Sequence, residues 1–514
     1  MKPRTLATSL FSATALASAL VAGPATAPSS AATSSEATAT DVCIPSVPET
    51  DPLEPGPVDI CMTVFKPASA SAANPVPMVL HSHGWGGTRT RTASSFQDLL
   101  DAGFGVISFD QRGFGESGGK AHVEDPAFEG EDVINVVDYV AGLDWVQHQA
   151  PNDPVLGAIG ASYGGGYQFV GAFTEIMQSG STRFDALVPE ITWNSLNDSL
   201  APDDVVRTEW VSALYAAGAD AHTSTVHEGF AEGLATGNWP KSMDEFFADN
   251  GPAFHVAAGR RLDIPVLFRQ GISDNLFPLD QALENYDQAL TPQARSNSIL
   301  VGYNGGHALP EAVPPGYAVD GDACSGTLGG PSVQDFGDLQ VEFLRENLMG
   351  APRELHGQGL YHLMTADGDC LTVDSVQPNT SYNLGRITTT TGAGAPQAVK
   401  IADGPITVAG TSYVDALVSS LGDDSRAFFA LSVGTSPSDA KVVQNNVLPH
   451  REPTANTKGT QRTIELPSVA VDVPAGQSLF LTVSPVADMF GAHGSRTPGE
   501  MVLDHPVVRL PVVH

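Results

Sequence analysis

Between about residues 58 and 350, short apolar runs alternate with longer stretches in which apolar residues recur at helical spacing. The short runs are apolar on both faces, which is typical of parallel strands covered by helices on both sides. We expect these strands at residues 78–81, 106–109, 155–159, 187–188, 266–268 and 299–301. Helices are expected between and after them, for example at residues 133–146 and 336–348. This alternation predicts an α/β domain with right-handed crossovers.

The alternation stops in two places. Residues 194–261 carry several helical patterns and no convincing strand, so we expect an insertion here that caps the sheet. From about residue 355, short β-rich segments are separated by Gly, Pro, Asp and Ser, a pattern typical of an all-β sandwich. We therefore expect an α/β domain at residues 43–354, with its cap at about 194–261, and a β-sandwich domain at residues 355–514.

The first 42 residues have the pattern of an export signal and a spacer. Lys2 and Arg4 precede an uncharged apolar run at residues 6–21, and small residues follow at 22–32. We interpret residues 1–32 as a signal peptide and residues 33–42 as a flexible spacer. An uncleaved anchor is the alternative, but the run is shorter than the ~20 residues that a span needs. The mature chain is expected to have no membrane span and to be secreted or loosely bound to the cell envelope.

Length and charge narrow the possible classes of protein. The chain has 514 residues, which is long for one core and agrees with two domains. It carries 58 acidic and 25 basic residues, a formal net charge of −33. Because such a surface repels nucleic acid and anionic lipid, neither is expected as a partner. The sequence leaves the oligomeric state open.

Four cysteines agree with export to an oxidising compartment. Four cysteines permit three pairings. We expect Cys43 to pair with Cys61 and Cys324 with Cys370, because these pairings close the shortest loops. The sequence has no Cys-x-x-Cys motif, so we do not interpret the cysteines as a metal site.

The clearest chemical motif is a Gly-x-Ser-x-Gly at residues 160–164, centred on Ser162. It follows the apolar strand at 155–159 and precedes a helix-compatible run. A serine in this context occupies a tight strand-to-helix turn, which needs small neighbours and lifts the hydroxyl out of the sheet. The helix N-terminus behind it favours developing negative charge. A plain glycine-rich turn is the alternative interpretation.

A serine hydroxyl becomes a good nucleophile when a base takes its proton, and the base needs an orienting carboxylate. In α/β-hydrolases the chain order is Ser, then Asp or Glu, then His. Asp274 follows the strand at 266–268, and His307 follows the strand at 299–301. Both occupy loops at the carboxyl ends of strands, where open α/β sheets place their sites. The sequence therefore predicts a catalytic triad of Ser162, Asp274 and His307.

Other acids and histidines are possible but fit this order less well. Asp280 is the alternative acid, although Pro278 favours a helix start that would place Asp280 on the helix. Asp274 itself has a structural alternative as the N-cap of that helix. Three histidines of the cap region lack a preceding core strand: His222, His227 and His255.

A tetrahedral intermediate also needs N–H donors for its oxyanion. The main-chain amide of Tyr163, directly after the nucleophile, is one donor by position. The second is expected in the glycine-rich loop at residues 83–87, and we assign it to Trp85, most simply through its main-chain amide. A turn without a catalytic role is the alternative. The loop at residues 110–119 is expected to be structural, with a pair between Asp110 and Arg112 that braces it.

Together these motifs resemble the X-Pro dipeptidyl-peptidase family, which also includes the cocaine-esterase-type acyl hydrolases. The likeness rests on Gly-x-Ser-Tyr-x-Gly at 160–165, Asp-x-Arg-Gly-x-Gly-x-Ser at 110–117, the Gly-x-x-Asp acid loop and the Gly-Gly-His loop. Residues 471–476 and 507–512 are also similar to the C-terminal jelly-roll domain of that family. The resemblance implies an α/β-hydrolase fold with a C-terminal jelly-roll-like sandwich. It also implies Ser162 as nucleophile, His307 as base and Asp274 as acid.

The chain departs from this family pattern at the oxyanion loop. Cocaine-esterase-like members use a tyrosine side chain there, whereas this loop offers Trp85. A true dipeptidyl-peptidase also needs acidic residues that hold the free N-terminus of its substrate. Glu190 or a carboxylate of the cap is a candidate, but nothing in the sequence selects one.

The leading hypothesis is a secreted serine hydrolase that forms an acyl-enzyme on Ser162. It would cleave peptide bonds, as X-Pro dipeptidyl-peptidases do, or carboxyl esters, so the expected partner is a small ester or peptide substrate. No metal or organic cofactor is implied. The competing hypothesis is a non-catalytic exported binding protein that uses the β-sandwich, with the α/β domain as a scaffold.

Overall fold

The computed structural model describes residues 37–307, 314, 316–491, 494–495 and 497–514. The signal peptide expected at residues 1–32 lies outside the described residues. Ala37 to His514 belong to one structural unit. In this described part of the chain, no helix is long and apolar enough to cross a membrane.

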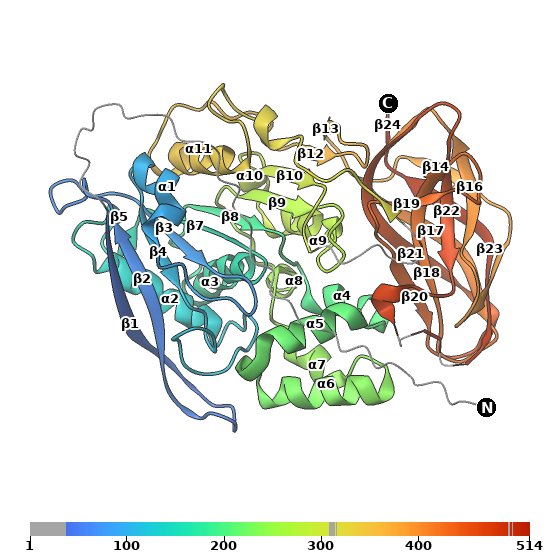
Figure 1. The fold of residues 1–514 in the computed structure, drawn as a ribbon, viewed down its shortest axis with the longest axis horizontal. Coiled ribbons are helices and arrows are strands. Elements are labelled where there is room, and N and C mark those ends of the chain that lie inside the picture. Colours follow the sequence, from blue (N-terminus) through green and yellow to red (C-terminus); the bar gives the residue numbers. More distant parts are fainter. Residues whose placement is uncertain (1–36, 308–313, 315, 492–493, 496) are drawn as a thin grey trace, which may run out of the picture. The chain divides into compact units, whose positions relative to one another are not determined.

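A ten-stranded sheet forms the core of the first part of the chain (Figure 1). Its order is β1-β2-β4-β3-β7-β8-β9-β10-β12-β13. The six central strands run parallel to one another. They are β4 (Gly105–Phe109), β3 (Met78–Ser82), β7 (Leu156–Ala161), β8 (Ala186–Glu190), β9 (Leu267–Gly271) and β10 (Ile299–Tyr303). Each of the six predicted apolar runs falls on one of these strands, so the prediction of an α/β sheet is confirmed.

Helices cover both faces of the sheet, which explains why its strands are apolar throughout. On one face, α2 (Glu129–Ala141) and α3 (Tyr163–Ser179) contribute to a buried apolar cluster. On the other face, α1 (Gln97–Ala102) and α11 (Phe336–Leu348) contribute to a second cluster. Helix α11 has the bounds predicted from its periodicity, whereas α2 starts and ends earlier than the expected 133–146.

The sheet also begins earlier than the apolar runs indicated. An antiparallel pair, β1 (Thr38–Glu49) and β2 (Gly56–Lys66), adds to the edge at β4. Residues 38–42, expected to be a flexible spacer, therefore form a paired strand that begins with Thr38 opposite Lys66. The reason is that residues 38–41 of this edge strand are small or polar and exposed, which resembles a spacer until their partner is known.

At the other edge, β12 (Tyr361–Met364) runs parallel to β10, and β13 (Cys370–Val373) pairs with β12. The large sheet thus continues past residue 354, where the sandwich was expected to begin. We propose that the boundary between the two domains follows Val373. Both expected cysteine pairs are disulfide-bonded, Cys43 with Cys61 and Cys324 with Cys370.

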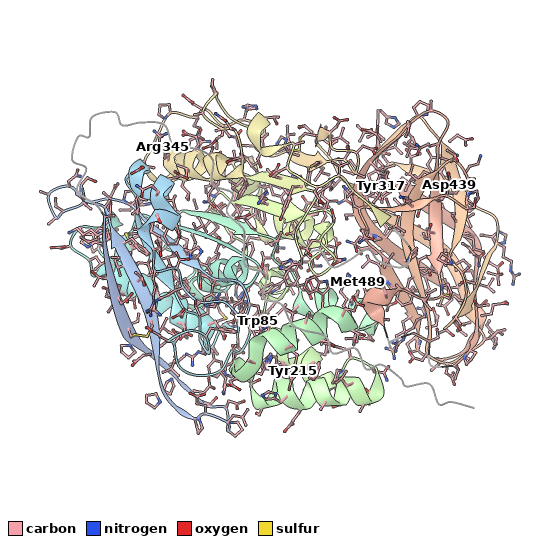
Figure 2. The ribbon with its side chains drawn as sticks, viewed as in Figure 1. Trp85, Tyr215, Tyr317, Arg345, Asp439 and Met489 are labelled. Atoms are coloured by element: carbon pink, nitrogen blue, oxygen red, sulfur yellow. A yellow bond between two sulfur atoms is a disulfide. The ribbon has the colours of Figure 1, made fainter. Side chains whose placement is uncertain are left out.

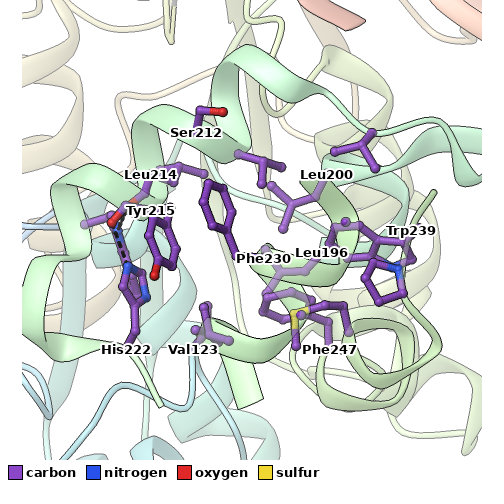
Figure 3. Close-up of a pocket in the computed structure, with 18 of the residues that line it drawn as sticks. Val123, Leu196, Leu200, Ser212, Leu214, Tyr215, His222, Phe230, Trp239 and Phe247 are labelled. Carbon is purple, nitrogen blue, oxygen red and sulfur yellow. Dashed lines mark hydrogen bonds between the residues drawn. The ribbon is translucent and has the colours of Figure 1, made fainter. Parts of the chain in front are cut away.

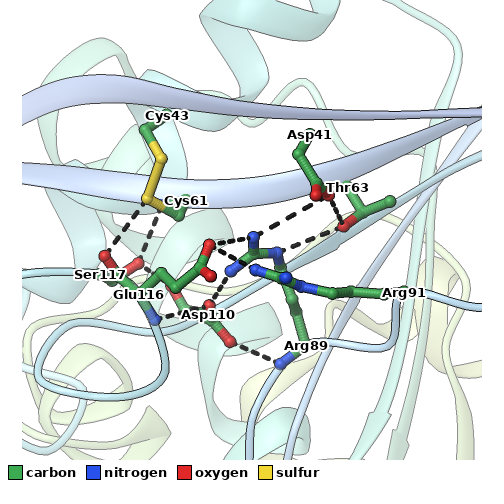
Figure 4. The surroundings of a disulfide bond; sticks show 9 residues. All are labelled: Asp41, Cys43, Cys61, Thr63, Arg89, Arg91, Asp110, Glu116 and Ser117. Carbon is green, nitrogen blue, oxygen red and sulfur yellow. Dashed lines mark hydrogen bonds and ion pairs between the residues drawn. A yellow bond between two sulfur atoms is a disulfide. The ribbon is translucent and has the colours of Figure 1, made fainter.

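The loop after β4 is braced differently from our expectation (Figure 4). Asp110 binds Arg89, through both its main-chain amide and its guanidinium, and does not bind Arg112. Arg112 instead donates two hydrogen bonds to Asp132 on α2, at 2.6 and 2.9 Å. The predicted Asp110–Arg112 pair is therefore wrong, because each residue finds a buried partner from another element. Ser117 joins this loop to β2 by accepting from the amide of Cys61.

The cap lies between β8 and β9 and consists of helices in the described residues 194–261. These are α4 (Leu196–Leu200), α5 (Thr208–Gly218), α6 (Ser224–Thr236), α7 (Lys241–Phe246) and α8 (Pro252–Ala257). Apolar residues of the cap form one buried cluster with residues of the loops after β7 and β9, including Tyr163 and Phe277. The cap therefore covers the carboxyl ends of the strands, where the predicted site residues lie.

Two facing sheets form the C-terminal part of the chain around their own apolar core. One contains β11 (Gly316–Tyr317), β19 (Lys441–Val443), β18 (Ser425–Gly434), β22 (Ser478–Ser484), β16 (Gln397–Asp403) and β20 (Leu448–Glu452). The other contains β14 (Thr380–Asn383), β15 (Ile387–Thr391), β23 (Gly499–Leu510), β17 (Ile406–Ser420), β21 (Asn456–Val473) and β24 (Val512–Val513). The predicted β-sandwich is confirmed. Strand β11 follows His307 in the chain, so the sandwich also holds a segment of the hydrolase part.

Four carboxylates interact where α9 (Leu279–Glu284) packs against β21. Asp280 and Glu284 belong to α9, Asp198 to the cap and Glu465 to β21. Burial, reinforced by repulsion from Asp280 and Asp198, raises the pKa of Glu284 and of Glu465 to about 8. In the folded chain these two side chains therefore keep protons that ordinary glutamates lose.

We expect these groups to make the free energy of unfolding fall as the pH rises from about 4.5 to about 8. In that window the folded state binds protons that the unfolded state has released. Glu465→Gln should therefore raise the melting temperature at about pH 8 and change it little at about pH 4. Thermal denaturation at both pH values measures this, with Glu232→Gln on the exposed face of α6 as a control. Equal shifts at the two pH values would contradict the account.

Candidate active site

Ser162 lies on the turn between β7 and α3, with a backbone φ of 59° and ψ of −121°. This conformation is strained for a residue with a side chain. Neighbouring glycines make it possible, because a Cβ at Gly160 would overlap the carbonyl oxygen of Gly164, and one at Gly164 would overlap that of Ser82. The turn thus holds the serine hydroxyl above the sheet, at the N-terminus of α3.

The structure brings the three predicted triad residues into one hydrogen-bonded row. His307 Nε2 lies 2.9 Å from Ser162 Oγ, and His307 Nδ1 lies 2.6 Å from Asp274 Oδ2. These distances suit a ring whose Nδ1 donates to the carboxylate and whose Nε2 accepts from the serine hydroxyl. The row therefore has the arrangement that activation of a serine nucleophile requires.

Asp274 is fully buried, and its carboxylate is held from two sides. Its Oδ1 accepts the main-chain amides of Leu276 and Phe277, each at 2.9 Å, while Oδ2 faces His307. Two aromatic rings meet the imidazole at steep angles, Phe277 at 5.2 Å and Trp210 at 5.8 Å between ring centroids. These contacts fix both the acid and the ring that it orients.

The alternative residues from the sequence lie elsewhere. Asp280 sits in the first turn of α9, where it accepts a hydrogen bond of 3.1 Å from Gln281. The cap histidines have other partners: His222 and His227 bond to Tyr215, and His255 stacks on Phe173. The described contacts thus place Asp274 and His307, and none of these alternatives, in the hydrogen-bonded row with Ser162.

The glycine-rich loop at residues 83–87 passes directly beside the serine. A Cβ at Gly84 would lie 3.8 Å from the Cβ of Ser162. The indole N–H of Trp85 donates to the carbonyl of Leu214 in α5 at 2.8 Å, so this side chain is turned towards the cap, near Tyr215 (Figure 2). Only the main-chain amide of Trp85 is then available to an oxyanion. Tyr163 is the first residue of α3, where a main-chain amide has no acceptor within the helix.

The phenol of Tyr163 is buried beneath this site. Burial, reinforced by Glu129 and Glu124, raises the pKa of the phenol well above its usual range. Burial likewise raises the pKa of the Glu124 carboxyl. Burial therefore disfavours the charged form of both side chains.

A cavity of about 120 Å³ opens beside Ser162 and extends under the cap (Figure 3). Apolar and aromatic side chains dominate its walls, and the residues described as lining it include no Asp, Glu, Lys or Arg. The walls come from cap helices α4 to α7, from loops next to them, from the loop of Trp85, from the start of α3 and from the acid loop. Among the lining residues are Trp85, Tyr163, Trp193, Leu196, Leu200, Val211, Leu214, Tyr215, His222, Val226, Phe230, Leu234, Trp239, Met243, Phe247 and Phe277. The site is thus suited to an uncharged, apolar group.

Glu190 is not placed to hold a substrate ammonium group. Its carboxylate is ion-paired with Arg269 at 2.9 Å, and Arg269 also binds Asp322. Glu190 is absent from the described lining of the cavity. Within the described ranges, no group of three His, Cys, Asp or Glu side chains is placed to hold a metal ion.

Sequence reasoning missed the residues that shape this cavity and those that hold the acid loop from outside. Phe277 could have been suspected, since it follows Asp274 by three positions. The cap helices show their apolar faces in sequence, but not which face meets Ser162. Asn446 of the sandwich, which donates to the main-chain carbonyl of Asp274, gives no sequence signal because 172 residues separate the two.

Residues 56–308 match the family model of the X-Pro dipeptidyl-peptidase (S15 family). Curated relatives match shorter stretches. An uncharacterized 31.7 kDa protein in the traX-finO intergenic region of Escherichia coli is 35% identical over 97 residues, which is 19% of this chain and 32% of that protein. The uncharacterized protein YcjY of E. coli K12 is 29% identical over 112 residues, 21% of this chain and 35% of that protein. The chain thus aligns with about a third of the length of these relatives.

Solved structures resemble nearly the whole chain. A CocE/NonD family hydrolase from Staphylococcus aureus has a TM-score of 0.62 and 11% identity, over 93% of this chain and 97% of that one. An α-amino acid ester hydrolase has a TM-score of 0.61 and 13% identity, over 95% and 98% of the two chains. At such low identity these likenesses establish the fold, an α/β-hydrolase domain followed by a β domain. Together with the match of residues 56–308, they make this chain similar to the serine-type hydrolases of the X-Pro dipeptidyl-peptidase (S15) family.

Proposed function

We propose that this chain is an exported carboxyl ester hydrolase that accepts uncharged substrates with an apolar acyl group. One observation carries the proposal: Ser162, linked to His307 and Asp274, lies in the wall of a cavity whose described lining has no Asp, Glu, Lys or Arg. A buried apolar cavity selects apolar groups and strongly disfavours an unpaired charge. The two disulfides and the N-terminal pattern support export.

The proposed reaction has two acyl-transfer steps. Ser162 Oγ attacks the ester carbonyl carbon while His307 Nε2 takes its proton, and Asp274 stabilises the imidazolium. The main-chain amides of Trp85 and Tyr163 bind the oxyanion. The tetrahedral intermediate collapses, the alcohol leaves with the proton from His307, and the acyl group stays on Ser162. A water molecule, deprotonated by His307, then attacks the acyl-enzyme. The bond between the acyl carbon and Ser162 Oγ breaks, the carboxylic acid leaves, and His307 returns the proton to Oγ.

Cleavage of X-Pro peptides is the second candidate, and the match of residues 56–308 to the dipeptidyl-peptidase family favours it. A free peptide N-terminus is an ammonium group, which needs a carboxylate partner when it is buried. The described cavity lining offers none, and Glu190 is already paired with Arg269. We therefore place ester hydrolysis first. We place the hypothesis of a non-catalytic binding protein last, because a scaffold would have no use for the hydrogen-bonded row of Ser162, His307 and Asp274.

Ser162→Ala should abolish covalent labelling by a fluorophosphonate and lower hydrolysis by about six orders of magnitude. Alanine retains the small size that the strained turn needs, so the fold should persist. Gel fluorescence and a spectrophotometric ester assay measure the two effects. Ser179→Ala, at the far end of the same helix, should label normally. Labelling that persists in Ser162→Ala would refute the nucleophile assignment.

The acid assignment can be tested by comparing two aspartates. Asp274→Asn should keep the shape of the loop but favour the wrong imidazole tautomer, lowering turnover by about 10⁴. Asp280→Asn should leave turnover close to that of the wild type, because Asp280 makes no described contact with His307. Initial rates at saturating substrate decide between them. A dead Asp280→Asn and an active Asp274→Asn would reverse the assignment.

The choice between ester and peptide can be tested with a substrate panel. We expect kcat/KM to be higher for p-nitrophenyl butyrate and octanoate than for the p-nitroanilide of Ala-Pro. The apolar acyl chains can fill the cavity, whereas the charged N-terminus of the dipeptide would be buried without a partner. Rapid hydrolysis of the anilide with negligible hydrolysis of both esters would overturn the proposal in favour of a peptidase.

Gly233 of α6 lines the cavity, so a larger side chain at this position should shorten the space available to an acyl chain. A Cβ there meets only ordinary contacts, 3.7 Å from Asn238 and Pro240, so a side chain can be added without a backbone clash. Gly233→Leu should lower kcat/KM for the octanoyl ester by about tenfold or more while leaving the acetyl ester within about twofold. Ala235→Leu, on the exposed face of α6, is the matched control. An unchanged chain-length profile would show that acyl chains bind elsewhere.

A further inference from the structure

A short segment of the β-sandwich reaches the catalytic acid. Residues 444–446 connect β19 to β20, and two of them, Gln444 and Asn445, have positive φ values of 51° and 52°. Non-glycine residues adopt this left-handed conformation at a cost, so the surrounding contacts must hold it. Gln444 and Asn446 are fully buried, although they belong to a loop. Contacts of Gln444 and Asn446 with the rest of the chain must therefore stabilise this loop.

Asn446 holds the acid loop through its main chain. Its Nδ2 donates a hydrogen bond of 3.2 Å to the carbonyl oxygen of Asp274. The carboxylate oxygens of Asp274 are already bound by His307 and by two main-chain amides. The peptide unit that follows Asp274 is therefore fixed by the sandwich, while the side chain is fixed within the hydrolase domain.

Gln444 holds the strand end that leads to the base. Its Nε2 donates to Asn304 Oδ1 at 2.9 Å and to the carbonyl of Met364 at 3.1 Å. Its Oε1 accepts from the amide of Ala470 at 2.9 Å. Asn304 lies three positions before His307, at the end of β10. The same segment of the sandwich thus contacts both the acid loop and the approach to the histidine loop.

The cap holds the next residue of the acid loop. Arg207 donates to the carbonyl of Asn275 at 2.7 Å, and the indole N–H of Trp210 donates to Asn275 Oδ1 at 2.9 Å. Residues of η6 (Asp488–Phe490) in the sandwich pack against α5, which carries Trp210. Residues 274 and 275 are therefore the place where catalytic domain, cap and sandwich meet.

We propose that Asn446 is a positioning residue for the catalytic acid, which makes the sandwich a working part of the active site. This inference rests on the proposed role of Asp274. When the hydrogen bond from Asn446 is lost, the peptide unit after Asp274 can rotate. The hydrogen bond between the Asp274 carboxylate and His307 Nδ1 then loses its alignment. Small displacements of a catalytic group are costly, since a shift of about 1 Å can lower a rate by about 10². Gln444 supports the same geometry from the side of the base.

Asn446→Leu tests this proposal with the full-length enzyme. The Asn446 Oδ1 is buried without a described hydrogen-bond partner, so leucine removes an unsatisfied acceptor together with the donor. The free energy of unfolding should change little, because removal of the unsatisfied acceptor offsets the cost of the lost hydrogen bond. Turnover should fall about tenfold while KM stays within about twofold. The rate of fluorophosphonate labelling of Ser162 should fall in parallel, whatever the natural substrate.

Asn379→Leu is the matched control. Asn379 also donates to a main-chain carbonyl, that of Val512 at 2.8 Å, but within the sandwich and away from the acid loop. This variant should lose stability and keep its labelling rate. Asn446→Ala, which adds no bulk, gives the same readout if the leucine variant does not fold.

The decisive comparison places Asn446→Leu in the Asp274→Asn background. If Asn446 acts through the acid, the second substitution should lower the labelling rate by less than about twofold. A loss as large as in the wild-type background, or no loss in either background, would overturn the inference. Failure of the wild type to label at Ser162 would instead overturn the proposed function, and this inference with it.

Discussion

The carboxyl group of Asp274 is buried away from water, so protein groups must supply its hydrogen bonds. Two main-chain amides and the imidazole of His307 supply them. This requirement fixes the relative positions of three loops. The acid loop must lie within hydrogen-bond distance of His307, and His307 must lie within hydrogen-bond distance of Ser162. The parallel sheet makes the meeting possible, since β7, β9 and β10 end on the same side. The cap and the sandwich fix the acid loop from outside through Asn275 and Asn446.

The elements that could be predicted from sequence are those with local signals. Buried parallel strands are continuous apolar runs, and a serine between such a strand and a helix marks a strained turn. Chain order then selected Asp274 and His307 over Asp280 and the cap histidines, and the structure places the selected residues beside Ser162. The amphipathic period of α11 gave its bounds for the same reason, because its apolar face is set by residues close together in the chain.

The rest depends on pairing between distant segments, which no local pattern records. The first residues of strand β1, 38–41, are small or polar and exposed, so only their register with β2 distinguishes them from a linker. Asp110 lies two residues from Arg112, yet it binds Arg89, because the buried loops bring that guanidinium closer. Asn446 is another such case, since its role near Asp274 exists only in the folded arrangement. In our proposal, substrate preference also depends on such distant contacts, because faces of several cap helices meet over Ser162.

The most direct test of the central claim is a crystal structure of the enzyme after reaction with an alkyl fluorophosphonate. The account predicts a covalent bond between phosphorus and Ser162 Oγ, with the phosphoryl oxygen within hydrogen-bond distance of the Trp85 and Tyr163 amides. The alkyl chain should lie in the cavity beneath the cap, and His307 should remain bound to Asp274. Phosphorus on another residue, or a phosphoryl oxygen that points away from both amides, would contradict the account.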